Sequence, residues 1–403
     1  MTIDSIPSLA GLTLAFLFAA GCGDSGSGDE DAGTGTDTDA AATPLTVDEV
    51  TPVATAYADL VYATYDDALS RAEALDVAVQ AFVDAPDAET HEAAKAAWLE
   101  ARSPYGQSEG FRFYDGPIDD ADGPEGQLNA WPMDESYVDG VEGMPDSGII
   151  NDPDVDITAD MLASLNEEGG EENVATGYHA IEFLLWGQDL SEDGPGARTF
   201  EDYVDGGPAS HPDRRGLYLR TVSGLLLTDL QAVRDEWADE SGAYRAEFLA
   251  LSPDALIQKV MRGIGTLTAA ELSEERMNVA YDTKLQEDEH SCFSDNTHND
   301  ILYNFLSIAN VVRGRYGSVQ GPGLITLVHA RDPALAQAIE DHLVETEALI
   351  MAIPAPFDQA IEGDDADPGR MAVAAAIESL RDLGDLFVQA ASLMDLTLNT
   401  SLE

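Results

Sequence analysis

The sequence predicts an all-α protein with two helical domains, and three observations support this. Apolar residues recur at helical spacing over long stretches of the chain. No stretch alternates β-branched or aromatic residues with polar ones for long enough to predict a strand. The chain after its N-terminal segment has about 360 residues, a length that favours two domains over one.

The first predicted helix covers residues 46–84 and begins at a capping box, with Thr46 at the N-cap and Glu49 at N3. A second helix is predicted at 89–103. Residues 104–155 are irregular and rich in Pro, Gly and Asp, and a long ordered loop of this kind is often functional. Further helices are predicted at 156–165, 173–187, 214–238, 253–268, 268–285, 298–313, 332–351 and 369–396, with a connecting loop at 353–368.

The polar, Gly- and Pro-rich residues 188–213 contain the predicted domain boundary. We assign residues 45–205 to an N-terminal helical domain and residues 206–403 to a C-terminal helical domain. The helices of each half are compatible with packed bundles.

The N-terminus predicts export. Residues 9–21 are apolar and have the length of a signal-peptide core, and the segment that ends in Cys22 resembles a bacterial lipobox. Residues 1–22 therefore predict a lipoprotein signal peptide with lipidation at Cys22. A signal cleaved without lipidation and a misassigned start are the alternatives, because Asp4 precedes the core and no Lys or Arg does. Residues 23–44 predict a disordered acidic tether.

The charge is strongly negative, with 19 basic residues against 77 acidic ones and a formal net charge of −58. Binding to nucleic acid through a basic patch is excluded on this ground. An acidic surface suited to a salty habitat explains the charge, and a surface that concentrates cations near a site is the functional alternative. Cys292 has no evident partner if Cys22 is lipidated, so no disulfide is predicted.

The central feature is the stretch 173–189, which is apolar on all sides of a helix except at His179 and Glu182. These two residues lie three apart and therefore share a face. A buried carboxylate and imidazole are costly unless they are paired or bound to a metal, so we interpret them as part of a functional site.

Two other stretches carry candidate site residues. His290, Asp295 and His298 lie in an acidic segment that is a plausible ligand source for a cation. The structural alternative for this segment is a capping box at residues 297–300. Glu109 and Arg112 are three apart between aromatic residues and predict either a structural ion pair or a pair that orients the site.

The motifs of common hydrolases and nucleotide-binding proteins are missing from the sequence. It has no His-Glu-x-x-His helix, no Gly-x-Ser-x-Gly elbow, no phosphate-binding loop and no Gly-x-Gly-x-x-Gly. No complete protease metal motif is visible, so catalytic residues are not predicted.

Gly177-x-His179-x-x-Glu182, continued by Trp186-Gly187, resembles the signature of the imelysin family. The segment 286–298 is similar to the subgroup named iron-regulated protein A. Blocks at 98–102, 109–112, 128–135 and 310–314 are similar to further family blocks in the same order. The resemblance implies two domains, each like a four-helix bundle, with the site at their interface.

The resemblance also implies an extracytoplasmic lipoprotein that binds a metal ion or an iron-containing ligand in iron acquisition. We expect iron, zinc or copper at His179, Glu182, His290 and His298, with Glu109, Arg112 and Asp295 binding the ligand. The implied partners are the membrane, through the lipid anchor, an iron or haem-type ligand, and a membrane uptake protein. The implied location is the periplasmic face or the outer membrane of a Gram-negative-type bacterium.

Two alternatives remain open at the level of the sequence. One is a metal-dependent peptidase that uses the His-x-x-Glu helix. The other is a non-catalytic protein-binding lipoprotein, in which His179 and Glu182 form a structural pair.

Overall fold

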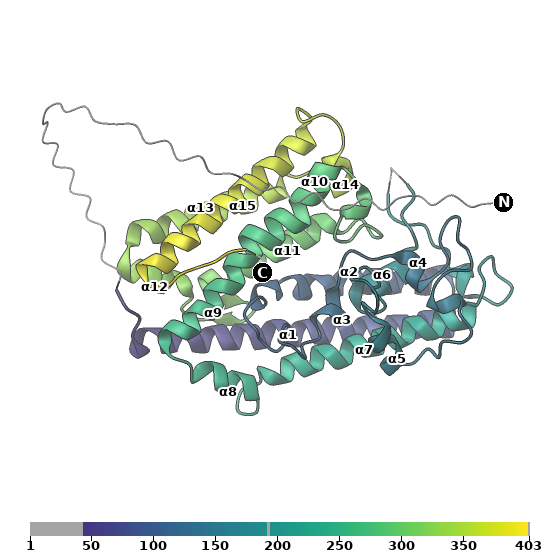
Figure 1. Cartoon of the computed structure of the whole chain (residues 1–403), viewed down its shortest axis with the longest axis horizontal. Coiled ribbons are helices and arrows are strands. Elements are labelled where there is room, and N and C mark those ends of the chain that lie inside the picture. The colour runs from purple at the N-terminus through teal and green to yellow at the C-terminus, as the bar shows by residue number, and fades with distance from the viewer. Residues whose placement is uncertain (1–42, 192–193, 402–403) are drawn as a thin grey trace, which may run out of the picture. The chain divides into compact units, whose positions relative to one another are not determined.

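Helices account for nearly all the regular structure in residues 43–191 and 194–401, the parts of the chain that the computed structural model describes (Figure 1). Within these residues the only strands are β1 (Arg315–Tyr316) and β2 (Val319–Gln320), which pair as a short antiparallel hairpin. The all-α prediction is confirmed.

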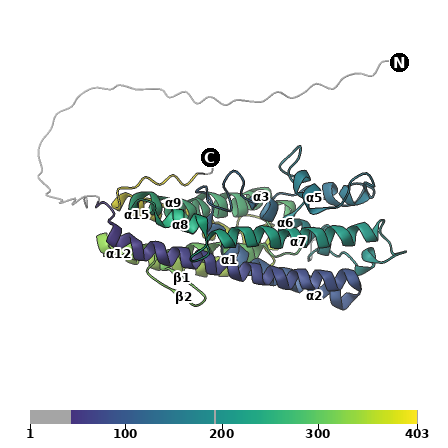
Figure 2. The ribbon, with the colours of Figure 1, turned by 90° about the horizontal axis from the view of Figure 1, so that it is seen from below.

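The longest helix is α1 (Val47–Asp84), with 38 residues. It begins at the predicted capping box, where the Thr46 N–H donates to Glu49 Oε1 over 2.7 Å. Its apolar side packs along α2 (Ala88–Gly106) and α7 (Pro212–Glu236). Figure 2 shows the axes of α1 and α7 nearly aligned, with the two helices running in opposite directions. The buried face of α1 follows the helical period that its sequence predicts.

The C-terminal helices form a second packed group. α13 (Pro333–Met351) packs on α15 (Pro368–Leu393), which also packs on the π-helix η4 (Leu267–Asn278). The other long helices of this group are α9 (Pro253–Thr266) and α11 (Thr297–Arg313).

Short helices fill several segments between the long ones. They are η1 (Glu109–Phe111), α3 (Glu125–Asn129), α4 (Glu135–Val138), η2 (Ile149–Asn151), α5 (Ala159–Leu165), η3 (Phe200–Tyr203), α8 (Ala243–Leu249), α10 (Val279–Thr283), η5 (Gln286–Asp288), α12 (Leu324–Arg331) and α14 (Phe357–Ile361). The predicted loop 353–368 is therefore partly wrong, because α14 lies within it. The predicted helix 268–285 is divided into η4 and α10 and ends at Thr283.

The central helix α6 (Gly177–Trp186) is shorter than the predicted 173–187 but is buried at all ten positions, as expected. It packs against α7, α2 and α3. Because α7 begins after residue 205 and contacts both α1 and α6, the two predicted halves adjoin at this helix. The described residues from 43 to 401 group into one compact unit. The boundary between residues 205 and 206 stays a prediction.

The predicted signal peptide, the lipidated Cys22 and the tether up to residue 42 lie outside the described residues. Among the described helices, none combines the length and the apolar character that crossing a membrane requires.

Candidate functional site

Gly177, the first residue of α6, explains the glycine of the Gly-x-His-x-x-Glu motif. Its φ is +80°, and a Cβ at this position would lie 2.5 Å from the Leu128 carbonyl oxygen. Only glycine combines this backbone conformation with such a close approach. The glycine therefore lets the start of α6 pack against α3, two residues before His179.

His179 and Glu182 form a buried pair on α6. His179 Nδ1 lies 2.9 Å from Glu182 Oε2, and both side chains are fully buried. The other carboxylate oxygen accepts hydrogen bonds from the Ser294 N–H (3.0 Å) and the Ser294 hydroxyl (2.6 Å). His179 Nε2 is buried and has no hydrogen-bond partner. A buried ring nitrogen without a hydrogen-bond partner is uncommon. It lowers the stability of the fold unless a ligand binds to it.

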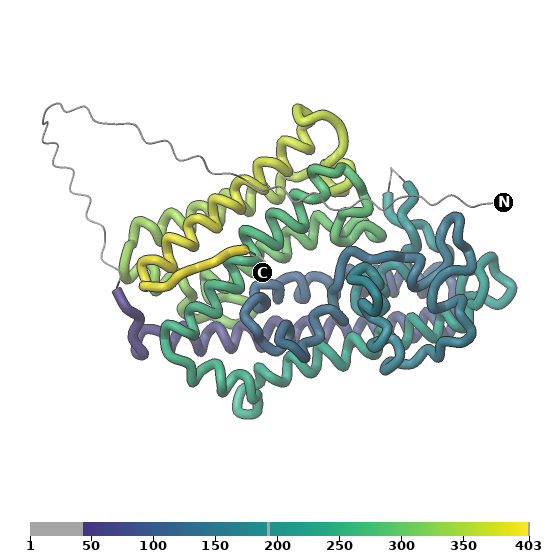
Figure 3. The backbone as a smooth tube through the Cα atoms, viewed as in Figure 1, coloured from purple at the N-terminus to yellow at the C-terminus, as the bar shows by residue number. Residues whose placement is uncertain are grey.

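The bond from Ser294 brings together segments that are 112 residues apart, which can be followed along the backbone in Figure 3. The same segment places His290 beside His179, with ring centroids 4.7 Å apart and an interplanar angle of 77°. The structure thus joins α6 and the acidic stretch before α11, as the sequence predicts for His290.

His290 is held in the same way as His179. Its Nδ1 lies 3.0 Å from Asp300 Oδ2, and Asp300 also accepts two hydrogen bonds from the Arg102 guanidinium, at 3.0 and 3.2 Å. All three side chains are buried. In each histidine a carboxylate occupies Nδ1 and leaves Nε2 facing away from it. This is the arrangement by which proteins orient a histidine toward a metal ion.

The two histidines and their two carboxylate partners, Glu182 and Asp300, differ in charge. Burial raises the pKa of Glu182 to about 8, against the hydrogen bonds from Ser294. Burial lowers the pKa of His179 well below its usual value, and burial with the nearby Arg276 lowers that of His290 to about 4. For Asp300, Arg102 and His290 outweigh burial and lower the pKa. Both imidazoles are therefore neutral near pH 7, the state in which they bind metals.

Asn129 connects this centre to a second ionic cluster. Its oxygen accepts from Arg102 over 2.6 Å, while its Nδ2 lies 3.3 Å from Glu109 Oε1 and 3.4 Å from His290 Nε2. Glu109 accepts from Arg112 (2.7 Å) and Arg276 (2.9 Å). Burial alone would raise the pKa of Glu109, but the two arginines lower it to about 2. The predicted pair Glu109–Arg112 therefore lies beside the centre, one residue removed from His290.

A pocket with a volume of about 430 Å³ opens from this region. Buried His290 and Asn129 line it, together with Trp131, whose ring centroid is 4.9 Å from that of His179. Trp131 Nε1 is buried and has no hydrogen-bond partner. The pocket thus reaches His290 directly and is separated from His179 by the Trp131 ring.

Two predicted ligands lie elsewhere. Burial, together with the neighbouring Asp358 and Asp189, raises the pKa of Asp295 to about 7. His298 is half-buried and is not in ring contact with His179 or His290 in the described part of the chain. Cys292 is a buried thiol whose pKa burial raises well above its usual value. Neither Asp295 nor His298 is brought to the paired histidines.

Six residues of the site were not predicted from the sequence: Arg102, Asn129, Trp131, Arg276, Ser294 and Asp300. For Asp300 the pattern suggested a capping box at 297–300, which is wrong. The N-cap of α11 is Asn296, and Asp300 points into the interior to bind Arg102 and His290. A charged residue inside a predicted buried segment was the available signal for Arg102 and Asp300.

In the described part of the chain, no three His, Cys, Asp or Glu side chains converge closely enough to hold a metal ion by themselves. The paired histidines can supply two nitrogen ligands. His179 Nε2 has no partner, whereas His290 Nε2 would have to give up its 3.4 Å hydrogen bond from Asn129 Nδ2. Any further ligands of a bound metal would have to come with it.

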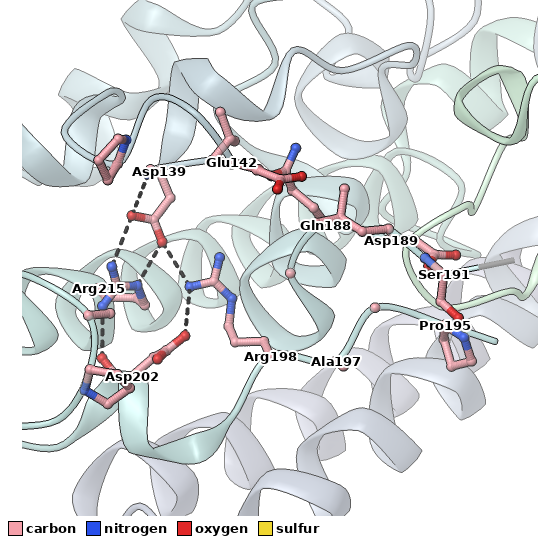
Figure 4. Close-up of a pocket in the computed structure, with 18 of the residues that line it drawn as sticks. Asp139, Glu142, Gln188, Asp189, Ser191, Pro195, Ala197, Arg198, Asp202 and Arg215 are labelled. Carbon is pink, nitrogen blue, oxygen red and sulfur yellow. Dashed lines mark hydrogen bonds and ion pairs between the residues drawn. The ribbon is translucent and has the colours of Figure 1, made fainter. Parts of the chain in front are cut away.

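A second pocket, of about 560 Å³, lies at the end of α6 (Figure 4). Its charged wall is an ion cluster in which Asp139 binds Arg198 and Arg215, and Asp202 lies 3.8 Å from Arg198. The two positive and two negative charges of this cluster balance, while Glu142 and Asp189 add two further carboxylates to the lining. No histidine lines this pocket. We therefore place the candidate site at the smaller pocket.

The sequence was also compared with known protein families. Residues 61–387 match the family model described as Imelysin, which carries a peptidase label. This match covers more than half of the chain. The chain belongs to the imelysin family.

Relatives of this imelysin-family chain extend the comparison. It is 26% identical over 344 residues to iron-regulated protein A of Synechococcus elongatus, and the match covers 81% of each chain. A crystal structure named for an iron-regulated protein A precursor of Parabacteroides distasonis superposes with a TM-score of 0.65 at 20% identity, covering 87% of this chain and 97% of that one. An imelysin-like protein of Psychrobacter arcticum gives the same TM-score at 15% identity, covering 89% and 99%. The two structures support the fold.

Proposed function

We propose that this imelysin-family protein binds iron, as an ion or as an iron-containing ligand, in iron acquisition. Two of its relatives are named iron-regulated protein A, which supports an iron-related role. The observation that carries the proposal is the unpartnered Nε2 of fully buried His179, 4.7 Å in ring-centroid distance from buried His290.

The coordination chemistry follows from the residues available. Two imidazole nitrogens suit iron, zinc or copper. The remaining positions of the metal fall to water or to ligands that arrive with it, because no third side chain converges on the centre in the described residues. Glu182 and Asp300 would act through the histidines by fixing their Nδ1 atoms. A metal bound at His179 Nε2 requires the neutral tautomer in which Nδ1 carries the proton and donates it to Glu182 Oε2.

The location belongs to the same proposal. The apolar residues 9–21 and Cys22 support export and lipid anchoring at the outer face of a bacterial membrane. An extracytoplasmic iron-binding protein would hand its cargo to a membrane uptake partner.

Calorimetric titration with Fe(II), Zn(II) and Cu(II) tests the site. We expect His179→Ala to abolish binding and Glu182→Gln to weaken it about 10- to 100-fold, the usual effect of removing a group that orients a metal ligand. His329→Ala, on the exposed end of α12, is the matched control and should bind normally. Unchanged affinity in His179→Ala would overturn the site assignment.

A further inference from the structure

The pocket beside the paired histidines is strongly acidic. Six carboxylates line it against two guanidinium groups and one neutral imidazole. The carboxylates are those of Glu125, Glu167, Glu171, Glu271, Glu275 and Asp288. A concave surface lined by one sign of charge focuses the field and concentrates ions of the opposite sign.

These carboxylates are arranged by depth. Glu167, Glu171 and Glu275 are exposed and form what we call the acidic mouth. Glu125, Glu271 and Asp288 are half-buried below it, and buried His290 and Asn129 lie deepest. A cation that enters meets exposed charge first, then partly desolvated charge, and finally the imidazole.

The two arginines do not offset this field. Arg112 binds Glu109 at 2.7 Å and Glu125 at 3.0 Å. Arg276 binds Glu109 and Glu271, each at 2.9 Å. Three carboxylates thus neutralise two guanidinium groups, and the four remaining acidic groups of the pocket have no basic side chain among its lining residues. Arg112 Nε has no hydrogen-bond partner, but its guanidinium group is already paired with two carboxylates, so the described lining offers no unpaired positive charge to an anionic ligand.

We infer that the ligand of this pocket is a hydrated cation or a small cationic complex, and that the pocket rejects anionic iron chelates and haem. The inference rests on the proposed function and narrows its ligand class. A volume of about 430 Å³ accommodates an ion with its water shell and lies toward the small end of ligand pockets, which span about 300–1,000 Å³. Proteins often discriminate between ligands by placing charges that repel the wrong one, and here the carboxylates of the pocket would repel an anionic chelate.

The unpartnered imidazole nitrogen agrees with this ligand class. His179 Nε2 is buried, has no hydrogen-bond partner and lies behind the Trp131 ring that lines the pocket. A neutral imidazole binds a cation through its free nitrogen. Water molecules bound to a metal ion turn their hydrogen atoms outward and can donate to the surrounding carboxylates.

The test compares ligand classes and an acidic-mouth variant. The triple variant Glu167→Gln, Glu171→Gln, Glu275→Gln changes exposed residues only. The control Glu73→Gln, Glu247→Gln, Glu378→Gln removes the same charge at exposed positions that do not line the pocket. Stopped-flow spectroscopy with Co(II), and equilibrium titrations with Co(II), ferric citrate and haemin, are carried out on both variants and on the unmodified protein.

We expect Co(II) to bind at least about 100-fold more tightly than either anionic chelate. In the acidic-mouth variant, Co(II) association should slow about tenfold at low salt, within the range of electrostatic steering. The difference should vanish near 1 M salt, where the screening length is about 3 Å. The control variant should keep most of the native rate.

Two results would overturn the inference: anionic chelates that bind as tightly as Co(II), or an acidic-mouth variant whose association rate equals that of the control. Either result with His179→Ala still abolishing Co(II) binding would leave the proposed function intact. Co(II) binding that is unaffected by His179→Ala would instead contradict the proposed function.

Discussion

Glu182 and Glu109 are both buried carboxylates of the site region, yet their surroundings act in opposite directions. Glu182 accepts from neutral groups only, and burial raises its pKa to about 8. Glu109 lies between Arg112 and Arg276, which lower its pKa to about 2 against the effect of burial. The pair shows that the ionic partner, rather than burial, decides the charge of a carboxylate here.

The first prediction concerns Glu182→Gln in metal-free protein. Because the folded pKa of about 8 exceeds the unfolded value of 4.5, the stability that this group provides is full below pH 4.5 and is lost as the pH rises through 8. The native protein should lose this stability between pH 5 and pH 8, and the Glu182→Gln variant should not. The free energy of unfolding of the variant minus that of the native protein should therefore increase over this range. The increase should be a few kcal/mol, at about 1.4 kcal/mol per pKa unit.

Urea unfolding at several pH values measures this. Glu109→Gln is the control, since a folded pKa of about 2 leaves Glu109 ionised throughout this range. Its stability difference from the native protein should be constant between pH 5 and 8. If the stability difference from the native protein were equally constant with pH in both variants, the raised pKa of Glu182 would be contradicted.

The second prediction concerns the buried pair Arg102–Asp300. Arg102→Met should lower the free energy of unfolding by about 3–5 kcal/mol, because it leaves the Asp300 carboxylate buried without its main partner. The double variant with Asp300→Asn should lose less than the sum of the two single variants. Urea unfolding of all four proteins gives the coupling energy, and simple additivity would show that the pair does not act as a unit.

At this scale the sequence predicted that His179 and Glu182 lie together, and the reason is local. His179 and Glu182 share one helix, so their spacing alone indicates that they meet. Arg102 and Asp300 are 198 residues apart, and no local pattern relates them. Their pairing depends on how α2 and α11 pack, which periodicity does not specify.

At the scale of elements, long amphipathic helices could be predicted and short ones could not. α1, α13 and α15 repeat their apolar positions over many turns, and this periodicity predicts them closely. α8, α12 and α14 have eight residues or fewer, too few turns to separate a helix from a polar loop. Val174 and Ala175 are apolar and buried like the residues of α6, so the predicted helix began four residues before Gly177.

The third prediction concerns the contact between α9 and η1. A Cβ on Gly263 would lie 2.4 Å from the Gly110 carbonyl oxygen. Gly263→Ala should therefore push away the turn that carries Glu109 and cost about 1–3 kcal/mol, as overpacking does. Gly224→Ala is the control, because a Cβ added at this position on α7 would meet no atom of a neighbouring element within 4 Å.

Thermal unfolding measures both variants. Gly224→Ala should raise the stability by about 0.5–1 kcal/mol, since alanine favours the helix. A Gly263→Ala protein as stable as Gly224→Ala would show that α9 and η1 can separate without cost.

At the scale of the whole molecule, the net charge of −58 dominates. The repulsion among the acidic groups opposes the compact state, and salt weakens it by shortening the screening length from about 10 Å at 0.1 M to about 3 Å at 1 M. The high charge is therefore consistent with a protein that works in salty surroundings.

The fourth prediction is that the melting temperature rises between 0.1 M and 1 M NaCl. Each kcal/mol of relieved repulsion should raise it by about 2–4 °C, as is typical for chains of about 150–250 residues. NaCl and KCl should give equal increases if screening is the cause. A melting temperature that does not change with salt would show that the acidic groups are too dispersed to destabilise the fold.

One feature of the site provides a reporter that needs no engineering. Cys292 lies two residues after His290, is buried, and has a pKa raised well above its usual value by that burial. Thiol reagents attack the thiolate, so this cysteine should be nearly inert while the segment stays closed. In a protein that begins after Cys22, a thiol-specific dye can modify only Cys292. The rate of this modification would therefore measure how often the segment 286–300 separates from α6. A ligand that bridges the two histidines should slow that labelling.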